Sequence, residues 1–261
     1  MKEMSSHHGV GSPSPYEIVK TGFGASVHFF EEVATTMEIA RQMANDGAPH
    51  MSVVVADSQV KGRGRLTRQF ISQKGGLFFT VIVKNKIPEE KPHLLNFSAS
   101  LCLVRAVKSL YPIDAGVKWP NDILVGGEKL SGMISEMIVS KDFGTYVNIG
   151  IGVNVNNDPP LTNTKATSLL TLTGKKTSVR NLLFTFLNRF NDHLDGGAFN
   201  TVVSEWKKET VSIGKPVRIE TTTEITEGHA VDVDDDGAMM VRMKDGFMKR
   251  VIYGDCFHPN A

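Results

Sequence analysis

The chain has 261 residues, of which 41% are hydrophobic and 22% are charged, so it is neither disordered throughout nor too short for a large core. Its 29 Lys and Arg residues are balanced by 28 Asp and Glu residues, which argues against a general polyanion-binding surface. No apolar run approaches the roughly 18 residues of a membrane span, and no export signal is visible. We therefore expect a cytoplasmic protein without membrane contact.

The first 213 residues predict a flexible tail followed by an α+β domain. Residues 1–15 are rich in Ser, Gly, Pro and His, and the pair His7–His8 has no third metal ligand nearby. Residues 16–213 alternate between helical and extended patterns, which is typical of helices packed on one central sheet. These patterns predict helices over about 33–45, 94–110, 182–190 and 202–208 and strands over 52–57, 76–83, 133–139 and 146–155.

Residues 214–261 predict a second, smaller unit. Glycines recur there at short intervals between β-prone runs, and Asp234–Gly237 and Lys244–Gly246 have the composition of hairpin turns. This pattern favours a small β-barrel appended to the main domain.

Three polar stretches are candidates for a functional site. The first, Lys61–Arg68, has the sequence KGRGRLTR and directly follows a predicted strand. Its four cations repel one another unless an anion binds, and Gly62 and Gly64 allow the backbone to approach a phosphate closely. A solvated basic loop explains the same composition, so this stretch alone leaves phosphate binding open.

The second stretch runs from residue 117 to residue 132 and contains VKWPND and EKLSG. Lys118 and Lys129 flank a Trp-Pro turn that ends in Asn121 and Asp122, so cations, an amide and a carboxylate converge. A surface turn with incidental charges is the alternative. Two charged turns in close succession favour a functional site.

The third stretch, NIGIGVNVN, begins at Asn148 and reads as a strand. Asn148, Asn154 and Asn156 alternate with apolar residues, so we expect them on one face together with Gly150 and Gly152. Asn is disfavoured in strands, so that face is either solvated or lines a polar ligand.

Two weaker candidates precede these stretches. Thr35 and Thr36 either cap the first helix or hydrogen-bond a small polar ring. Gln59 ends a predicted strand, where its amide faces either such a ring or solvent.

Four segments in a fixed order resemble the biotin protein ligase family. They are GRGRLTRQF (62–70), KGGLFFTVIV (74–83), VKWPNDILVGGEKLSGMISE (117–136) and IGIGVNVN (149–156). Their order and spacing make the resemblance specific, although each motif alone is weak. The resemblance implies a catalytic domain related to class II aminoacyl-tRNA synthetases, with a mixed β-sheet, and a small SH3-like C-terminal barrel.

The resemblance also implies a two-step reaction. The carboxylate of biotin attacks the α-phosphate of ATP, normally with Mg2+, to give biotinyl-5′-AMP and pyrophosphate. A specific lysine of a biotin carboxyl carrier domain then takes the biotinyl group, and AMP is released. The catalytic residues implied are Lys118, Asp122 and Lys129, with Lys129 at the biotin carboxylate and the α-phosphate. The residues implied for binding biotin and ATP are Thr35, Thr36, Met37, Gln59, Gly62, Arg63, Gly64, Arg65, Arg68, Asn121, Gly132 and Asn154.

Several features depart from the usual family pattern. Met37 stands where an Asn is usual and cannot hydrogen-bond comparably, Thr67 replaces a Gly, and Phe70 replaces a Trp and its indole NH. No counterpart of the DNA-binding domain of repressor members is visible, so we expect no DNA binding. Members are often dimers through a sheet edge, which leaves a homodimer open.

Two alternative functions remain. One is a lipoate or octanoate ligase of the same fold, and the other is a non-catalytic sensor of biotin or its adenylate. The GRGR loop, KWPND and the C-terminal barrel favour biotin over lipoate. The presence of Lys118, Asp122 and Lys129 together favours an enzyme over a sensor.

Overall fold

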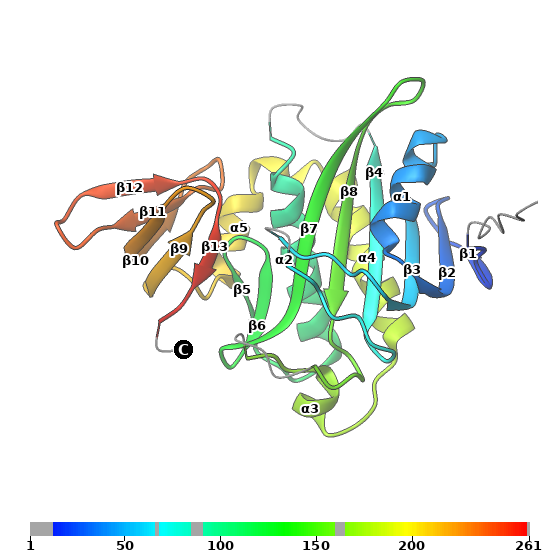
Figure 1. The fold of residues 1–261 in the computed structure, drawn as a ribbon, viewed down its shortest axis with the longest axis horizontal. Helices are drawn as coiled ribbons and strands as arrows, with labels where there is room; N and C mark the ends of the chain where they lie inside the picture. Colours follow the sequence, from blue (N-terminus) through cyan, green and yellow to red (C-terminus); the bar gives the residue numbers. More distant parts are fainter. Residues whose placement is uncertain (1–12, 66–67, 85–90, 160–164, 260–261) are drawn as a thin grey trace, which may run out of the picture.

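In the computed structural model, residues 13–65, 68–84, 91–159 and 165–259 are described, and they form two β-sheets of different size (Figure 1). The larger sheet has eight strands in the order β1-β2-β3-β4-β8-β7-β6-β5. β2 and β3 pair in parallel, and the other neighbouring strands of this sheet pair antiparallel, so the sheet is mixed, as predicted. Its strands are β1 (Glu17–Lys20), β2 (Ser26–Val33), β3 (Ser52–Gln59), β4 (Leu77–Lys84), β5 (Ala115–Lys118), β6 (Asp122–Val125), β7 (Glu128–Ser140) and β8 (Gly144–Val153).

Helices cover both faces of the larger sheet. They are α1 (Thr36–Asn45), α2 (Leu94–Leu110), α3 (Leu169–Thr173), α4 (Val179–Asp195) and α5 (Val202–Glu209), with a short 3₁₀ helix, η1 (Ala198–Asn200). α1 packs on one face beside β3, β4 and β8, whereas α2, α4 and α5 pack together on the other face (Figure 1). Alternation along β8 sends Val147, Ile149 and Ile151 into the core under α2 and α4. Asn148 and Gly150 consequently lie on the α1 face.

Helix α1 begins at the pair of threonines in the sequence. Thr35 is its N-cap, and the Thr35 hydroxyl oxygen accepts the backbone N–H of Met37 at 3.3 Å. Val33 fits the apolar spacing of this helix, but it is the last residue of β2, so the prediction of a helix from residue 33 is wrong there. Val33 packs in one cluster with Ala40 and Ala44, and the spacing therefore reflects a shared buried face.

The other predicted elements are present with changes at their ends. α2 spans the predicted residues 94–110, and β7 begins at Glu128, so EKLSG (128–132) opens this strand ahead of the predicted run 133–139. The sequence does not predict β1, β2, β5, β6 or α3. Four of these five elements have at most five residues, and β2 carries the exposed Glu31 and Glu32, which weaken its apolar pattern.

The smaller sheet lies on the C-terminal side of residue 213, where the sequence predicts a β-barrel. Its strands are antiparallel, in the order β12-β11-β10-β9-β13. Both predicted hairpin turns are confirmed: Asp234 N–H donates to the carbonyl of Ala238 at 2.9 Å, and Gly246 N–H donates to that of Met243 at 3.0 Å. The strands are β9 (Pro216–Glu220), β10 (Ile225–Val233), β11 (Met239–Arg242), β12 (Met248–Val251) and β13 (Asp255–Phe257).

The turn before β11 docks the smaller sheet on the larger domain. The indole N–H of Trp119 donates to the carbonyl of Gly237 at 2.9 Å, and Nε2 of His93 lies 2.6 Å from the carbonyl oxygen of Asp236. A Cβ on Gly237 would lie 2.9 Å from the ring of Phe97, so glycine permits this close approach. The docking places the C-terminal strands next to the Trp-Pro turn.

The chain ends add little to this framework. Residues 1–12, which include the His7–His8 pair, lie outside the described residues, and residues 13–15 have no regular secondary structure. Among the described helices, none combines the length and the apolar character needed to cross a membrane. Cys102 and Cys256 are both buried and are not bridged.

Candidate active site

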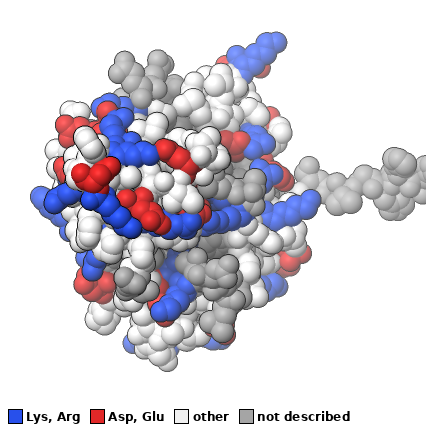
Figure 2. Space-filling model, turned by 60° about the vertical axis from the view of Figure 1, so that its left-hand side comes forward, with Lys and Arg blue, Asp and Glu red and all other residues white. Residues whose placement is uncertain are grey.

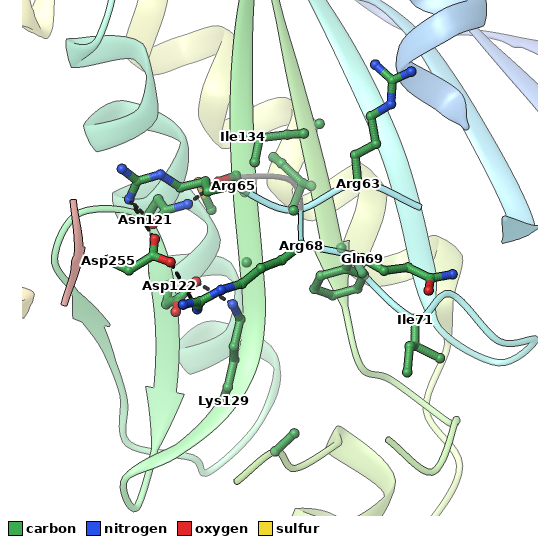
Figure 3. A pocket seen from close by; sticks show the side chains of 18 of the residues that line it. Arg63, Arg65, Arg68, Gln69, Ile71, Asn121, Asp122, Lys129, Ile134 and Asp255 are labelled. Carbon is green, nitrogen blue, oxygen red and sulfur yellow. Dashed lines mark hydrogen bonds and ion pairs between the residues drawn. The ribbon is translucent and has the colours of Figure 1, made fainter. Parts of the chain in front are cut away.

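A cavity of about 610 Å³ lies on the α1 face of the larger sheet, where the 62–70 loop, the β5–β6 turn and β13 meet (Figure 3). This volume is within the range of small-molecule sites. Gly62 lies outside the cavity wall, where a Cβ would be 2.2 Å from the carbonyl oxygen of Phe70. The other predicted site residues all line the cavity: Thr35, Thr36, Met37, Gln59, Arg63, Gly64, Arg65, Arg68, Lys118, Asn121, Asp122, Lys129, Gly132 and Asn154.

Lys129, Asp122 and Lys118 form a charged cluster in this cavity. Nζ of Lys129 lies 2.7 Å from Oδ1 of Asp122, and Nζ of Lys118 lies 3.5 Å from Oδ2. Burial raises the pKa of Asp122, but the two ammonium groups outweigh burial and bring its pKa below the usual value. Asp122 is therefore a carboxylate at neutral pH.

A β-bulge brings Lys129 and Gly132 to the same cavity. Asp122 pairs with Gly132 across β6 and β7, whereas Leu124 pairs with Lys129, so β7 contains one extra residue between these pairs. A Cβ on Gly132 would lie 2.9 Å from Nζ of Lys129, and the glycine therefore makes room for the ammonium group. Two backbone hydrogen bonds of 2.9 and 3.0 Å tie Lys129 to residues 165–167.

The smaller sheet holds two arginines of the 62–70 loop. The Arg65 guanidinium donates to the carbonyl of Gly254 at 3.0 Å and to Oδ1 of Asn121 at 3.2 Å. Oδ2 of Asp255 lies 2.9 Å from NH1 of Arg68 (Figure 3). Burial lowers the pKa of Arg65, and the nearby Asp255 only partly counteracts this effect. Oδ1 of Asp255 lies 3.8 Å from NH1 of Arg65, and an anionic ligand would add further counter-charge.

Arg63 lies apart from these two arginines. NH2 of Arg63 is 2.9 Å from Oε1 of Glu38 on α1, and its side chain points away from Arg65 and Arg68 (Figure 3). Of the three arginines, Arg65 and Arg68 are therefore the ones placed to meet an anion inside the cavity.

The positive charge of the cavity is a local feature. Over the face shown in Figure 2, Lys and Arg are interspersed with Asp and Glu and do not form one basic patch. Among the described residues that line the cavity, the charged side chains other than Arg63 are Arg65, Arg68, Lys118, Lys129, Asp122 and Asp255. Four cations against two carboxylates leave two positive charges, which favours a multiply charged anion such as a triphosphate.

A chain of hydrogen bonds lies in the part of the cavity beside β3 and β4. The Thr80 hydroxyl donates to the Thr36 hydroxyl at 2.8 Å, and the N–H and O–H of Thr36 donate to Oε1 of Gln59 at 2.8 and 3.2 Å. Nε2 of Gln59 then donates to Ser72 Oγ at 2.8 Å, and the Ser72 hydroxyl donates to the carbonyl of Phe70 at 3.1 Å. The sequence predicts Thr36 and Gln59 but misses Ser72 and Thr80, because isolated hydroxyl residues are common outside functional sites.

Two glycines of β8 make room for an apolar surface. A Cβ on Gly150 would lie 2.7 Å from Sδ of Met37, and a Cβ on Gly152 would lie 2.5 Å from the ring of Phe70. The ring of Phe70 also packs edge-on against that of Phe78, with centroids 6.2 Å apart. Met37 and Phe70, which depart from the usual family pattern, thus cover β8 between the hydrogen-bonded chain and the charged cluster. Thr67 lies outside the described residues.

The three asparagines of the third polar stretch have different surroundings. Asn154 lines the cavity. The Asn156 side chain instead exchanges hydrogen bonds with the backbone of Thr177. Asn148 is fully buried, and neither its Nδ2 nor its Oδ1 has a hydrogen-bond partner in the described part of the chain. The predicted common face is therefore wrong for Asn156, because β8 ends at Val153 and the chain turns.

Sequence reasoning also misses the contribution of β13. Asp255, Cys256 and Phe257 line the cavity, and the ring centroid of Phe257 lies 5.5 Å from the Arg68 guanidinium and 6.0 Å from Nζ of Lys118. Burial raises the pKa of the Cys256 thiol to about 12, so this thiol is unreactive at neutral pH. No local pattern marks these residues, because their contacts join segments far apart in the sequence.

The cavity thus combines a hydrogen-bonding part, an apolar surface and a part lined by cations. A cavity with this lining can hold an amphipathic acid next to a phosphate-bearing ligand. No group of three His, Cys, Asp or Glu side chains that could hold a metal ion is present among the described residues.

Comparisons with known proteins point to one family. Residues 29–154 match the biotin/lipoate A/B protein ligase family, and residues 212–258 match the biotin protein ligase C-terminal domain. The bifunctional ligase/repressor BirA of Bacillus subtilis is 33% identical over 235 residues, which cover 87% of this chain and 72% of that protein. The biotin–acetyl-CoA-carboxylase ligase of Mycobacterium tuberculosis is 30% identical over 218 residues, which cover 79% and 78% of the two chains.

A solved structure shares the architecture of both sheets. The biotin protein ligase from Aquifex aeolicus, determined in complex with biotin and ATP, superposes with a TM-score of 0.77 at 26% identity. The similarity covers 90% of this chain and 99% of that one, which confirms the predicted fold. The chain therefore belongs to the biotin protein ligase family of enzymes.

Proposed function

We propose that the protein uses ATP to form biotinyl-5′-AMP and transfers biotin from it to a specific lysine of a biotin carboxyl carrier domain. The observation that carries this proposal is the division of one cavity into a hydrogen-bonding part, an apolar surface and a part with four cations. These parts match the ring, the aliphatic chain and the carboxylate of biotin, with room for a triphosphate beside the carboxylate. Family membership supports biotin ligation.

The hydrogen-bonding part favours biotin over lipoate. Oε1 of Gln59 accepts twice from Thr36 and one Nε2 hydrogen goes to Ser72, which leaves one Gln59 hydrogen available to a ligand. The Thr35 hydroxyl oxygen accepts from Met37, and no acceptor for its own hydrogen is found among the described residues, so this hydrogen is also available. Both available groups are donors and match an acceptor such as the carbonyl oxygen of biotin's ureido ring. The dithiolane ring of lipoate has no such acceptor.

The first step brings two anions together. An oxygen of the biotin carboxylate bonds to the α-phosphorus, and the bond from that phosphorus to the β-phosphate oxygen breaks to release pyrophosphate. Lys129, Arg65 and Arg68 offset the repulsion and stabilise the charge that develops on the α-phosphate. Asp122 and Lys118 hold the Lys129 ammonium group in position.

We also propose that Mg2+ reaches the site bound to the triphosphate. Mg2+ is commonly held by phosphate oxygens, water and one or two carboxylates. Among the described residues, Asp122 and Asp255 are the carboxylates that line the cavity, and each is already paired with cations. They could each supply one oxygen ligand to an Mg2+ ion that is held mainly by the nucleotide. The ion would neutralise charge on the outer phosphates.

In the second step, the amine of the carrier lysine attacks the carbonyl carbon of the mixed anhydride. The bond from that carbon to the phosphate oxygen breaks, and AMP leaves with the electron pair. The amine must be neutral, although a free lysine has a pKa near 10.4. Asp122 is ionised, so its carboxylate can orient the amine. Its lowered pKa makes it a weak base, and it takes up the proton only as the nitrogen is acylated and loses its basicity.

The carrier and the setting of the reaction are part of the same proposal. The name of the Mycobacterium tuberculosis relative supports the biotin domain of an acetyl-CoA carboxylase as the acceptor. We propose that the reaction takes place in the cytoplasm. A homodimer remains a prediction from the family resemblance.

Mass spectrometry of a biotin carrier domain incubated with the protein, ATP, Mg2+ and biotin tests the proposal. We expect addition of one biotinyl group, with release of AMP, only when both ATP and biotin are present. The matched control is the same carrier with its acceptor lysine changed to Arg, which should stay unmodified. Lipoylation in place of biotinylation would identify the protein as a lipoate ligase. Biotin binding without any transfer would support the sensor alternative.

A further inference from the structure

Two buried hydroxyl residues, Ser72 and Thr80, stand at the two ends of the hydrogen-bonded chain through Thr36 and Gln59. Ser72 is 5% exposed and Thr80 is fully buried. We propose that both are positioning residues that set the hydrogen-bond polarity of the ring-binding part, so that Gln59 presents one N–H group to the ligand. The inference rests on the proposed function, because it takes the ureido ring of biotin as the ligand of this part.

The orientation of the Gln59 amide follows from a group that can only donate. The backbone N–H of Thr36 lies 2.8 Å from one terminal atom of Gln59, so that atom must be the oxygen, Oε1. The Thr36 hydroxyl donates to the same oxygen at 3.2 Å. With Oε1 used twice, Nε2 is the atom that faces Ser72.

Ser72 enforces the same orientation from the other side of the amide. Its hydroxyl hydrogen goes to the carbonyl oxygen of Phe70, which can only accept, so the Ser72 oxygen is left to accept from Nε2 of Gln59. Phe70 N–H in turn donates to the carbonyl of Gly62 at 2.9 Å. Ser72 therefore links the orientation of Gln59 to the base of the 62–70 loop.

Thr80 acts at the opposite end of the chain. Because the Thr80 hydroxyl donates to Thr36 Oγ1 at 2.8 Å, the Thr36 hydrogen is directed to Gln59 and not to a ligand. Without the Thr80 hydroxyl, the Thr36 hydroxyl can rotate and present a different arrangement of hydrogen-bond donor and acceptor to the ligand. The two end residues together leave one Gln59 hydrogen available. This hydrogen, like that of the Thr35 hydroxyl, requires an acceptor on the ligand.

If Ser72 and Thr80 only maintained the shape of the pocket, their replacement would affect ligand affinity differently. Loss of pocket shape would weaken every ligand that uses the ring-binding part, whereas loss of polarity would weaken only a ligand with an acceptor there. 2-Iminobiotin separates the two cases, because near neutral pH its protonated imino nitrogen places a donor where biotin has the carbonyl oxygen.

The test measures dissociation constants for biotin and for 2-iminobiotin by calorimetry. The wild-type protein should prefer biotin, and Ser72→Ala and Thr80→Val should each lower that preference about fivefold, which corresponds to one hydrogen bond. Ser72→Thr and Thr80→Ser, which keep the hydroxyl, should retain the wild-type preference for biotin. For Ser72→Ala and Thr80→Val, the change should appear in the binding of biotin, with kcat at saturating biotin much less affected. Ser52→Ala is the matched control, because Ser52 is also fully buried and its hydroxyl has no hydrogen-bond partner among the described residues.

The possible outcomes separate the inference from the proposed function. If the wild-type protein binds biotin and both variants keep its preference, or lose affinity for both ligands equally, the inference is wrong and the proposed function stands. If the wild-type protein binds no biotin, the proposed function fails and the inference fails with it. Thermal unfolding identifies any variant that does not fold, and the two sites lie on different segments, so either variant alone suffices for the test.

Discussion

Nζ of Lys129 lies 2.7 Å from Oδ1 of Asp122, beside a glycine, Gly132, that has no side chain to displace it. The Lys129 side chain is 27% exposed, so its ammonium group can be reached from the cavity. Asp122 remains ionised and Lys118 lies on its other oxygen. This cluster holds an ammonium group where the biotin carboxylate and the α-phosphate are proposed to meet.

Replacing Lys129 should slow adenylation strongly while leaving the biotin pocket intact. We expect Lys129→Met to slow biotin-dependent adenylation about 100- to 1000-fold, the usual effect of losing one group that stabilises transition-state charge. Biotin should still bind, because the hydrogen-bonding part and the apolar surface are unchanged. Single-turnover formation of the adenylate measures the effect, with Lys141→Met, an exposed lysine between β7 and β8, as the control. A Lys129→Met protein with wild-type rates would remove Lys129 from the mechanism.

The bulge in β7 leads to a second prediction, for Gly132. A Cβ at this position would lie 2.9 Å from Nζ of Lys129 and 3.2 Å from Oδ1 of Asp122, so Gly132→Ala should displace the ammonium group. A misplacement of about 1 Å can cost about 100-fold in rate, and we expect a loss of that order in adenylation. The same substitution at Gly22, where no atom lies within 4 Å of the added Cβ, should have no effect. Equal rates for the two variants would contradict the proposed place of Lys129.

The three loop arginines should differ in their effect on ATP. Arg65 and Arg68 lie against Asp255 inside the cavity, whereas Arg63 pairs with Glu38. We expect Arg65→Met and Arg68→Met each to raise the dissociation constant of a non-hydrolysable ATP analogue about 10- to 100-fold, as loss of charge-assisted hydrogen bonds does. The effect of Arg63→Met should be clearly smaller. Titration calorimetry in the presence of biotin decides this, and equal losses for all three variants would contradict the geometry.

The charged cluster was open to prediction because it comes from one short segment. Lys118, Asp122, Lys129 and Gly132 all lie within residues 117–132, so the spacing of VKWPND and EKLSG already brings them to neighbouring turns. The sequence does not reveal the bulge that turns Lys129 and Gly132 toward the same side, because a bulge depends on the pairing of two strands.

Contacts between distant segments could not be predicted in this way. Asp255 and Phe257 reach the cavity because the turn before β11 docks on Trp119, and one sequence contains no record of that docking. Ser72 and Thr80 gain their importance from the geometry around Gln59, which is set by three separate parts of the chain. Short strands such as β5 and β6 carry too few residues for a clear alternation.

Asn148 provides a prediction about stability. It is fully buried and its amide group has no hydrogen-bond partner among the described residues, an arrangement that costs about 1–3 kcal/mol. Asn148→Val should therefore raise the free energy of unfolding by an amount of that order. Urea unfolding measures the change, with Asn191→Val on the solvent side of α4 as a comparison in which no such gain is expected. Destabilisation by Asn148→Val would instead show that the Asn148 amide has a hydrogen-bond partner in the folded protein.

His258 makes the stability of the protein dependent on pH. Nε2 of His258 lies 3.2 Å from Oγ of Ser212, and burial, helped by the charges of Lys118 and Lys215, lowers the pKa of His258 from 6.5 to about 4. Between these values the unfolded chain binds a proton that the folded chain does not bind. Stability should therefore fall as the pH falls from about 6.5 to about 4.

The variant His258→Gln isolates this contribution. Burial also lowers the pKa of His28 and of His193, so these residues add a pH dependence of the same sign to both proteins. Urea unfolding between pH 7 and pH 4 should show a shallower loss of stability for His258→Gln than for the wild-type chain. Identical slopes would mean that His258 titrates alike in the folded and unfolded states.

Pyrophosphate exchange into ATP tests the central claim most directly, because it reports the adenylation step without any carrier. The assay is run with biotin, with lipoate and with neither acid. The proposed function predicts exchange with biotin and none in the other two samples. Exchange with lipoate but not with biotin, or no exchange despite measurable biotin binding, would contradict it.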